Sequence, residues 1–267
     1  MIGTVRLASF ILPAAVAALA APALAQGDAP AGWTVSVGPG AAYVPTFPGS
    51  DEHEIRFWPV IDVRRTGTEA EFETPDDSFG FGIVGNRSFR AGPSINIQSG
   101  RQEEDAIIGI GDVGTTVEGG VFAETFLADQ FRLRADARKG FGGHKGVVVD
   151  IGADAIAGRT SDRFHASIGP RLRFANGRYV RAFYGVNPNQ SSLTGLPVYD
   201  AGGGFHSAGV LAFASYKLNR SLAVQSYARY DRLVGDAAKS PLVLSEAGSR
   251  NQYEGGLGLS YSFNTGS

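Results

Sequence analysis

The stretch FHASIGPRLRF, residues 164–174, alternates apolar side chains with polar, charged or glycine residues along its whole length. Phe164 and Ile168 fall on one side of this pattern, and Arg171 and Arg173 fall on the other. Successive side chains of a β-strand point to opposite faces. The period of two therefore predicts a long strand with one apolar face and one charged face.

The same alternation recurs along the chain, with Gly, Asn, Asp and Pro between the runs, which favours an all-β fold. Each run has roughly 9 to 14 residues, and about 10 tilted residues suffice to cross the hydrocarbon layer of a membrane. We predict an antiparallel, up-and-down transmembrane β-barrel of about 12 strands, with about 10 as the alternative. An even number of strands places both termini on the periplasmic side. The predicted strands lie near 33–44, 54–65, 68–86, 89–99, 113–127, 130–139, 145–158, 162–174, 178–186, 205–218, 220–233 and 252–263.

Alternation alone does not decide which face of the barrel meets lipid, because a soluble barrel turns its apolar face inward. Two features favour a membrane barrel. The polar face is rich in charge, glycine and serine, which suits a crowded lumen. Aromatic residues also gather near strand ends, where interfacial girdles are found. These aromatic residues are Trp33, Tyr43, Phe131, Phe164, Phe174 and Phe263.

The N-terminus has the form of a secretory signal peptide. Arg6 precedes an apolar run that ends at Ala23-Leu24-Ala25, a small-x-small cleavage site. Two prolines interrupt the run, which disfavours the alternative of a membrane anchor. We expect residues 1–25 to be removed and residues 26–267 to form one barrel domain in the cell outer membrane.

Composition excludes several classes of function. The chain has no Cys, so disulfides, thiolate chemistry and cysteine metal sites are ruled out. Loss of Arg6 with the signal peptide leaves 23 basic and 26 acidic residues, a balance that argues against nucleic acid as a partner. No later segment approaches 18 uninterrupted apolar residues, so the chain is not a helical membrane protein.

Gly80-Phe81-Gly82-Ile83-Val84-Gly85 matches the G-x-G-x-x-G dinucleotide-binding pattern. That pattern works only where a strand turns into a helix whose N-terminus meets the pyrophosphate. Here another strand is expected to follow, so we interpret the glycines as part of a barrel strand.

No other motif predicts catalysis or a metal site. His53, His144, His165 and His206 lack metal-site spacing, and the acidic run around His53 is interpreted as a solvated loop rather than a cation site. G-x-S-x-G is absent. The acidic pairs Asp76-Asp77 and Glu103-Glu104-Asp105 fall in predicted turns. We therefore predict no catalytic, cofactor-binding or metal-binding residues and no enzymatic activity.

The charges of the polar face carry more information. They form either a self-neutralised plug of salt bridges, which we favour, or a narrow pore that is weakly anion-selective from its excess of arginine. The residues expected to face the lumen are Arg56, Asp62, Arg64, Arg90, Glu118, Glu124, Arg132, Arg134, Asp136, Arg138, Asp150, Asp154, Arg163, Arg171, Arg173, Arg181, Arg229 and Asp231.

The longest connections divide unevenly between the two ends of the predicted barrel. With a periplasmic N-terminus, segments 45–53, 187–204 and 234–251 become external loops. Segment 99–113 then becomes a periplasmic connection of unusual length, and we interpret it as a possible docking segment.

Several motifs, in order along the mature chain, resemble the MipA/OmpV family of MltA-interacting proteins. The closing pair of motifs is the most specific. The matching segments are Pro45-Thr46-Phe47-Pro48-Gly49-Ser50-Asp51, Trp58-Pro59-Val60-Ile61-Asp62, Ser99-Gly100-Arg101, Glu104-Asp105, Gly109-Ile110-Gly111-Asp112-Val113, Thr116-Val117-Glu118, Phe183-Tyr184-Gly185-Val186, Gly195-Leu196-Pro197-Val198-Tyr199, Arg232-Leu233-Val234-Gly235-Asp236-Ala237-Ala238-Lys239-Ser240-Pro241-Leu242-Val243 and Gly256-Leu257-Gly258-Leu259-Ser260-Tyr261-Ser262-Phe263.

The resemblance implies a non-enzymatic outer-membrane barrel surrounded by lipid and lipopolysaccharide. Its implied role is a scaffold that links a murein lytic transglycosylase to a peptidoglycan synthase, a penicillin-binding protein. The alternatives are a porin-like channel for small polar solutes and a surface adhesin that uses segments 187–204 and 234–251. The chain departs from the usual barrel ending, because Phe263 is followed by the tail Asn264-Thr265-Gly266-Ser267.

Overall fold

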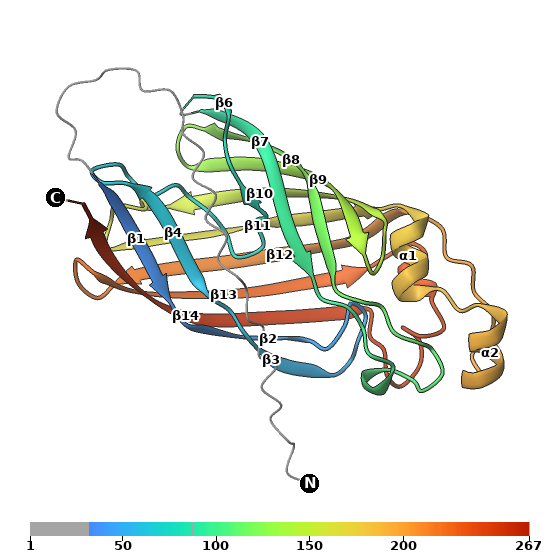
Figure 1. Ribbon diagram of the computed structural model, residues 1–267. Coiled ribbons are helices and arrows are strands. Elements are labelled where there is room, and N and C mark those ends of the chain that lie inside the picture. Colours follow the sequence, from blue (N-terminus) through green and yellow to red (C-terminus); the bar gives the residue numbers. More distant parts are fainter. Residues whose placement is uncertain (1–31, 87, 267) are drawn as a thin grey trace, which may run out of the picture.

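A computed structural model describes residues 32–86 and 88–266 of the chain, and these form a single antiparallel sheet of 14 strands (Figure 1). The prediction of an all-β antiparallel barrel is confirmed. The strands are β1 (Trp33–Gly38), β2 (Gly40–Pro45), β3 (His53–Phe57), β4 (Val60–Arg65), β5 (Phe79–Gly80), β6 (Val84–Gly85), β7 (Phe89–Gln98), β8 (Thr116–Leu127), β9 (Phe131–Gly142), β10 (Val147–Ala157), β11 (Phe164–Ala175), β12 (Gly204–Lys217), β13 (Leu222–Leu233) and β14 (Asn251–Thr265).

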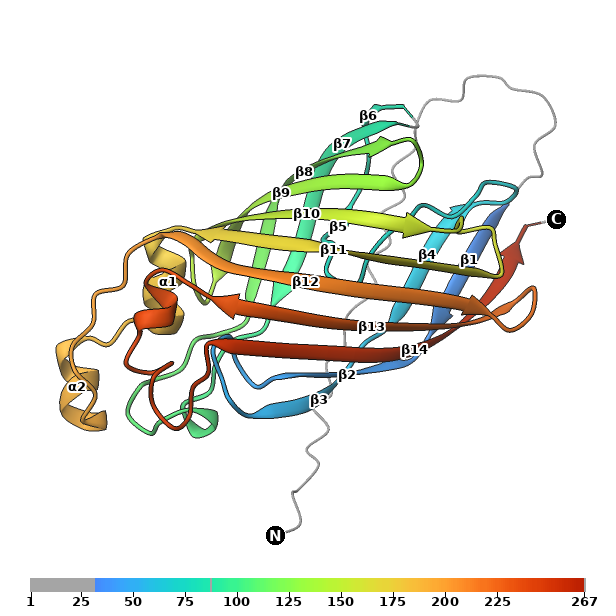
Figure 2. The same ribbon diagram turned by 180° about the vertical axis from the view of Figure 1, so that it is seen from behind.

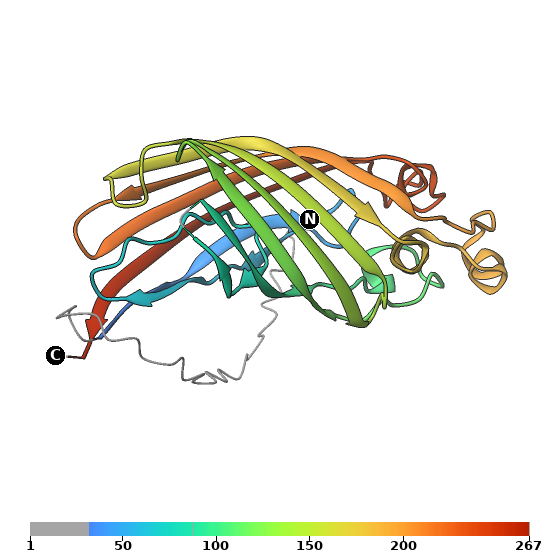
Figure 3. The ribbon, with the colours of Figure 1, turned by 90° about the horizontal axis from the view of Figure 1, so that it is seen from above.

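Strands β7 to β14 form an unbroken meander in which each strand pairs with its neighbour in sequence. The last strand, β14, then pairs with β1 and β2, and Trp33 lies opposite Thr265. The two ends of the described chain therefore meet at one end of the barrel, and helices α1 and α2 lie at the other (Figure 2). Seen from above, the long strands curve over the shorter first strands (Figure 3).

Prolines divide two of the predicted strands. Pro39 separates β1 from β2, and Trp58-Pro59 separates β3 from β4. Proline has no N–H to donate to a β-ladder, so it interrupts the strand assignment. The chain nevertheless keeps its course, since Trp58 N donates to Gly40 O over 2.9 Å and Leu259 N donates to Pro39 O over 2.9 Å.

The predicted strand 178–186 is wrong, because the segment forms helix α1 (Gly177–Tyr184). The Asn176 side chain caps this helix by accepting a hydrogen bond from Tyr179 N, as is typical of an N-cap. The buried residues Tyr179, Val180, Phe183 and Tyr184 recur with the helical period, not the strand period.

A second helix, α2 (Pro188–Thr194), follows α1 at once. Asn187 and Gln190 form a reciprocal capping box at its start, and Gly195 ends it in the left-handed conformation at φ 76°. Two single-turn 3₁₀ helices, Glu103–Asp105 and Ala237–Lys239, lie in the other long connections.

The predicted strand 68–86 is wrong over most of its length. Only the two-residue strands β5 and β6 join the wall, both against β7, with Phe79 opposite Ile95 and Val84 opposite Ala91. Residues 66–78 connect β4 to β5 without joining a ladder, and we call them the inner segment.

The loss of the predicted strand 68–86, which precedes segment 99–113, moves this segment to the other end of the barrel. Arg101 Nη1 donates to Phe183 O in α1 over 2.6 Å, and Gln190 Nε2 in α2 donates to Ile110 O over 2.5 Å. The periplasmic placement of this segment was therefore wrong, because it lies beside the helices with the other long connections.

The outer face of the wall is apolar and the inner face is charged. Phe57, Val121 and Ile168 are 69%, 60% and 57% exposed, whereas Glu118 and Arg132 are 1% and 2% exposed. A soluble barrel would show the opposite distribution, so the chain is an outer-membrane barrel with lipid around it. In the described part of the chain, no helix is long and apolar enough to cross a bilayer. The predicted signal peptide, residues 1–25, lies outside the described residues.

The cap of α1 gives a stability prediction. Asn176→Ala should lower the free energy of unfolding by about 1 kcal/mol, because Tyr179 N loses its acceptor. Val147 N also donates to the Asn176 side chain, over 3.1 Å. Urea unfolding of the refolded protein in detergent micelles measures the change. Asn189→Ala in α2 is the matched control, and an equal loss in both variants would contradict a specific capping role.

Candidate functional site

The inner wall of the barrel carries a dense set of charged side chains. Strand β9 alone contributes every second residue from Arg132 to Arg138, and all four of these side chains are buried. They lie on one face because the strand period is two. Neighbouring inward residues come from β8 (Glu118, Glu124), β10 (Asp150, Asp154), β11 (Arg171, Arg173) and β13 (Arg229, Asp231).

These charges pair across strands. Arg132 Nε lies 2.9 Å from a Glu124 oxygen, and Arg132 Nη1 lies 3.4 Å from Asp154. Asp154 also accepts a hydrogen bond from Arg171 Nη2 over 2.8 Å, so one carboxylate joins two arginines on different strands. Asp150 accepts from Arg173 Nε over 2.6 Å. The prediction of a salt-bridged lumen is confirmed for these residues.

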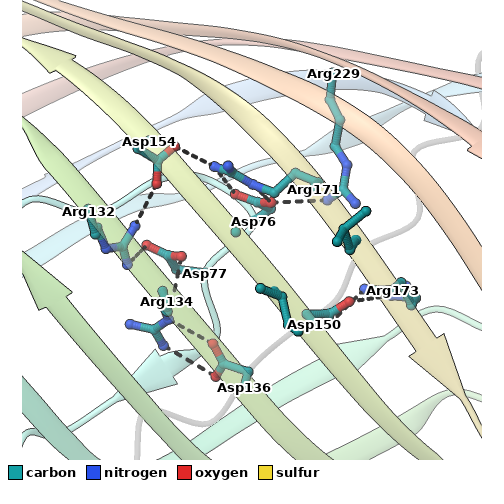
Figure 4. Close-up of a pocket in the computed structure, with 13 residues that line it drawn as sticks. Asp76, Asp77, Arg132, Arg134, Asp136, Asp150, Asp154, Arg171, Arg173 and Arg229 are labelled. Carbon is teal, nitrogen blue, oxygen red and sulfur yellow. Dashed lines mark hydrogen bonds and ion pairs between the residues drawn. The ribbon is translucent and has the colours of Figure 1, made fainter. Parts of the chain in front are cut away.

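The inner segment brings two further aspartates into this network (Figure 4). Asp76 lies 2.7 Å from Arg171 Nε and 3.3 Å from Arg229 Nη1. Asp77 lies 2.7 Å from Arg132 Nη2. The turn predicted for this acidic pair is present, since Asp77 N donates to Thr74 O over 3.0 Å, and the fold places it among the arginines of three strands.

Other contacts anchor the inner segment along its length. The Arg132 guanidinium lies 5.4 Å from the centre of the Phe72 ring, and Ser78 hydrogen-bonds to Asp136. At the end of the barrel where the termini lie, Glu69 accepts a hydrogen bond from Ser161 Oγ over 2.6 Å. The segment is therefore held from the rim to the middle of the lumen by side chains.

Charge balance explains why the inner segment lies there. The cavity at this level is lined by five arginines and five aspartates. Three of these aspartates belong to the wall, and the inner segment supplies the other two. The remaining cavity volume is about 30 Å³, room for one or two water molecules. Little free space therefore remains in this cavity.

The ion pairs change the acidity of Asp76. Burial alone would raise its pKa, but the charges of Arg229 and Arg171 outweigh burial and hold the pKa well below the ordinary value of 3.8. Asp76 therefore stays ionised and bound throughout the neutral and mildly acidic range.

Helix α1 covers the opposite end of the lumen. Its side chains Tyr179, Phe183 and Tyr184 are fully buried, and they pack around His144 and His206. The two histidines come from distant parts of the sequence, so spacing gave no sign that they share a cluster. His144 Nε2 lies 3.0 Å from Glu118, and His206 Nε2 lies 3.1 Å from the Tyr184 hydroxyl. Within residues 32–86 and 88–266, no group of three His, Cys, Asp or Glu residues is arranged to hold a metal ion.

Some predicted lumen residues lie elsewhere. Arg163 is exposed at a turn, 5.1 Å from the centre of the Tyr216 ring. Arg181 lies on α1, where it pairs with Asp200 over 3.5 Å. Both assignments to the lumen were wrong, the first because the strand begins at Phe164 and the second because the segment is helical.

The glycine-rich motif at residues 80–85 spans β5 and β6 and is not followed by a helix. The interpretation of its glycines as part of a strand is confirmed in part, since only four residues of β5 and β6 are paired. His53, which was predicted to lie in a solvated acidic loop, is the first residue of β3 and stacks on Tyr43 with ring centres 4.6 Å apart.

The comparison with protein families matches residues 37–263 to the model described as MltA-interacting protein MipA. No match is found among curated proteins. Among solved structures, Neisserial surface protein A is 12% identical, with 87% of this chain and 98% of that chain covered and a TM-score of 0.27. The outer membrane channel DcaP of Acinetobacter baumannii is 10% identical, with 90% and 100% covered and a TM-score of 0.38. Outer membrane protein OprG from Pseudomonas aeruginosa is 12% identical, with 87% and 96% covered and a TM-score of 0.25.

The network predicts a large cost for removing one partner. Asp76→Asn should lower the free energy of unfolding by about 3 kcal/mol, because Arg171 and Arg229 each lose one of their buried counter-charges and keep only Asp154 and Asp231, respectively. Urea unfolding in micelles measures the loss. Asp129→Asn, which breaks only an exposed 3.7 Å pair with Arg159, is the control and should change nothing measurable.

The lowered pKa of Asp76 gives a pH prediction with a fixed sign. A depressed pKa contributes stability that is complete above the ordinary value of 3.8 and is lost as the pH falls below it. The stability difference between the wild type and Asp76→Asn should therefore be constant near neutrality and shrink below about pH 4. A difference that grows on acidification would contradict the assignment.

Proposed function

Because the chain belongs to the MltA-interacting protein MipA family, we propose that it is a non-enzymatic scaffold of the outer membrane. In this role the rim of the barrel docks murein-processing enzymes, a lytic transglycosylase and a peptidoglycan synthase. The observation that carries the proposal is the salt-bridged lumen at the level of Asp76 and Asp77. A barrel whose inward charges bind one another offers its two ends, rather than its interior, as working surfaces.

The salt bridges across the lumen argue against steady conduction of solutes. The wall and the inner segment together leave a cavity of about 30 Å³ at the level of Asp76 and Asp77. Ion conduction needs a connected path lined by weak, exchangeable sites. Buried arginines that each bind one or more carboxylates do not provide such a path.

The two ends of the barrel differ in the length of their connections, and this difference indicates which end docks the partners. Short turns at 128–130, 158–163 and 218–221 lie at the end where the described termini meet. Outer-membrane barrels have short periplasmic turns and longer external loops. We therefore assign this end to the periplasm, where murein lies. The adhesin alternative would instead use segments 187–204 and 234–251 at the other end.

The periplasmic rim has the chemistry of a polar docking surface. Arg159, Arg220 and Asp129 are exposed there. The turn at 158–163 is also bound to the inner segment, since Thr160 Oγ1 donates to Ala70 O over 2.6 Å. A partner seated on this rim would contact both the wall and the base of the inner segment.

The proposal also covers the absence of catalysis and the route of export. The buried lumen carboxylates Glu118, Glu124 and Asp154 are all bound to arginines, which disfavours their use as catalytic bases. Residues 1–25 are proposed to be the export signal, on the strength of the apolar run and the cleavage site at Ala23-Leu24-Ala25.

A gated channel is the second candidate. The inner segment is held to the wall mainly by side chains, and none of its residues joins a β-ladder. Such a segment can leave the lumen without breaking the sheet. Its departure would leave the wall with an excess of arginine around the cavity.

Docking is tested by pull-down from envelope extracts with the tagged full-length protein. The wild type should recover a lytic transglycosylase or a penicillin-binding protein. The double variant Arg159→Glu/Arg220→Glu at the periplasmic rim should lose at least about tenfold of the recovered enzyme, because rim charges steer and orient a partner. The matched control Arg178→Glu/Lys239→Glu reverses two exposed charges at the other end and should recover as much as the wild type. Recovery of neither enzyme would refute the scaffold.

Planar-bilayer recording separates the scaffold from the channel. The wild type should show no conductance steps above the bilayer background. Asp76→Asn/Asp77→Asn should show intermittent steps with anion selectivity in a salt gradient, because the wall then carries unpaired positive charge. Steady conductance of the wild type would reject the closed barrel and favour the channel.

A further inference from the structure

A second hollow lies at the helix end of the barrel, outside the lumen network. It has a volume of about 520 Å³, within the usual range of small-molecule sites. Its walls come from segment 99–115, the turn between β9 and β10, the end of α1 and the start of α2. Nothing in the proposed scaffold role uses this hollow.

Arg101 lines this hollow and is only 3% exposed. Its Nη1 donates to Phe183 O over 2.6 Å, and its Nη2 donates to Gly111 O over 3.1 Å. Its Nε has no hydrogen-bond partner, and no carboxylate of the described ranges lies within 4.0 Å of the guanidinium. Carbonyl oxygens satisfy two of its donors but leave its charge without a counter-ion.

The pKa of Arg101 also reflects its lack of a counter-ion. Burial lowers the pKa of Arg101 to about 10, and the nearby carboxylate of Asp112 only partly opposes this effect. The buried arginines of the lumen differ from Arg101, because each of them contacts at least one carboxylate. An anion beside Arg101 would restore the balance that the lumen arginines already have.

Asp112 lies on the same hollow and supplies the opposite charge. Its Oδ1 accepts a hydrogen bond from Glu103 N over 2.9 Å, and the described residues place no cationic side chain within 4.0 Å of it. The other charged pair of the hollow, Arg181 and Asp200, is already joined at 3.5 Å. The hollow therefore offers one unmatched cation and one unmatched anion.

Apolar side chains also line this hollow. Val113 and Val186 are buried in the wall, and Val198 is 57% exposed beside Tyr199. Apolar walls with a few placed polar groups are typical of sites for small organic ligands. A simple anion would be repelled by Asp112, and a simple cation would be repelled by Arg101.

We propose that this hollow binds a small zwitterion, an amino acid or a short peptide. The ligand carboxylate lies toward Arg101, its ammonium group lies toward Asp112, and its apolar body contacts Val186 and Val198. The site goes beyond the scaffold role and depends on neither docking nor conduction.

Isothermal titration of the full-length, detergent-purified protein tests the site with defined probes. L-alanyl-L-leucine should bind. N-acetyl-L-alanyl-L-leucine lacks the ammonium group and L-alanyl-L-leucinamide lacks the carboxylate, so each should bind at least about tenfold more weakly. This comparison uses only the wild type, so no folding defect can affect it. No binding of the dipeptide at millimolar concentration, or equal binding of all three probes, would overturn the proposal.

A variant pair locates the bound ligand. Asp112→Asn keeps the shape of the side chain and should weaken binding of the dipeptide about tenfold, while binding of the acetylated probe stays unchanged. Arg178→Gln removes an exposed charge of α1 that does not line the hollow, and it should bind the dipeptide like the wild type. Heat-modifiable gel migration checks that both variants are folded. Equal affinity of Asp112→Asn and the wild type for the dipeptide would place the ligand elsewhere and refute the site.

Discussion

The structure depends on the neutralisation of buried arginines in a confined lumen. A guanidinium removed from bulk water needs hydrogen-bond acceptors and a nearby counter-charge, and carboxylates provide both in the lumen. Arg132, at 2% exposure, meets Glu124 from β8, Asp154 from β10 and Asp77 from the inner segment. The wall supplies carboxylates to its own arginines, and the inner segment adds Asp76 and Asp77 as further counter-charges, which holds this segment inside the barrel.

The same requirement limits what the barrel can do. Each carboxylate used to balance an arginine is unavailable for chemistry, and each side chain that enters the lumen removes space for solute. Lipid on the outside favours an apolar face, so the charges of the membrane-spanning strands face inward. In the proposed scaffold, recognition of partners therefore falls to the two ends of the barrel.

Much of the fold was predictable from the sequence because a lipid-embedded strand alternates apolar residues that face outward with polar residues that face inward. Strands β7 to β14 and the inward charges of β8 to β11 followed from the period of two. Helix α1 did not, although Asn176 and the spacing of Tyr179, Val180 and Phe183 carry a helical signal. This short amphipathic segment was predicted to be a strand like the segments on either side of it.

The inner segment and the two hollows were beyond the reach of periodicity. Asp76 meets Arg229 across 153 positions of sequence, and Arg101 meets Phe183 across 82. Such pairs depend on how the barrel closes, not on any local pattern. The turn at Asp76 and Asp77 was predicted, but its position inside the lumen beside the arginines of the wall was not.

The position of the inner segment along the chain has a consequence for assembly. Asp76 and Asp77 lie before β7, whereas their partners Arg132, Arg171 and Arg229 lie on β9, β11 and β13. The aspartates emerge early in synthesis but have no complete set of counter-charges until most of the meander exists. Closure of the lumen by the inner segment is therefore a late event in the maturation of the barrel. A sheet that still lacks its later strands leaves the lumen open.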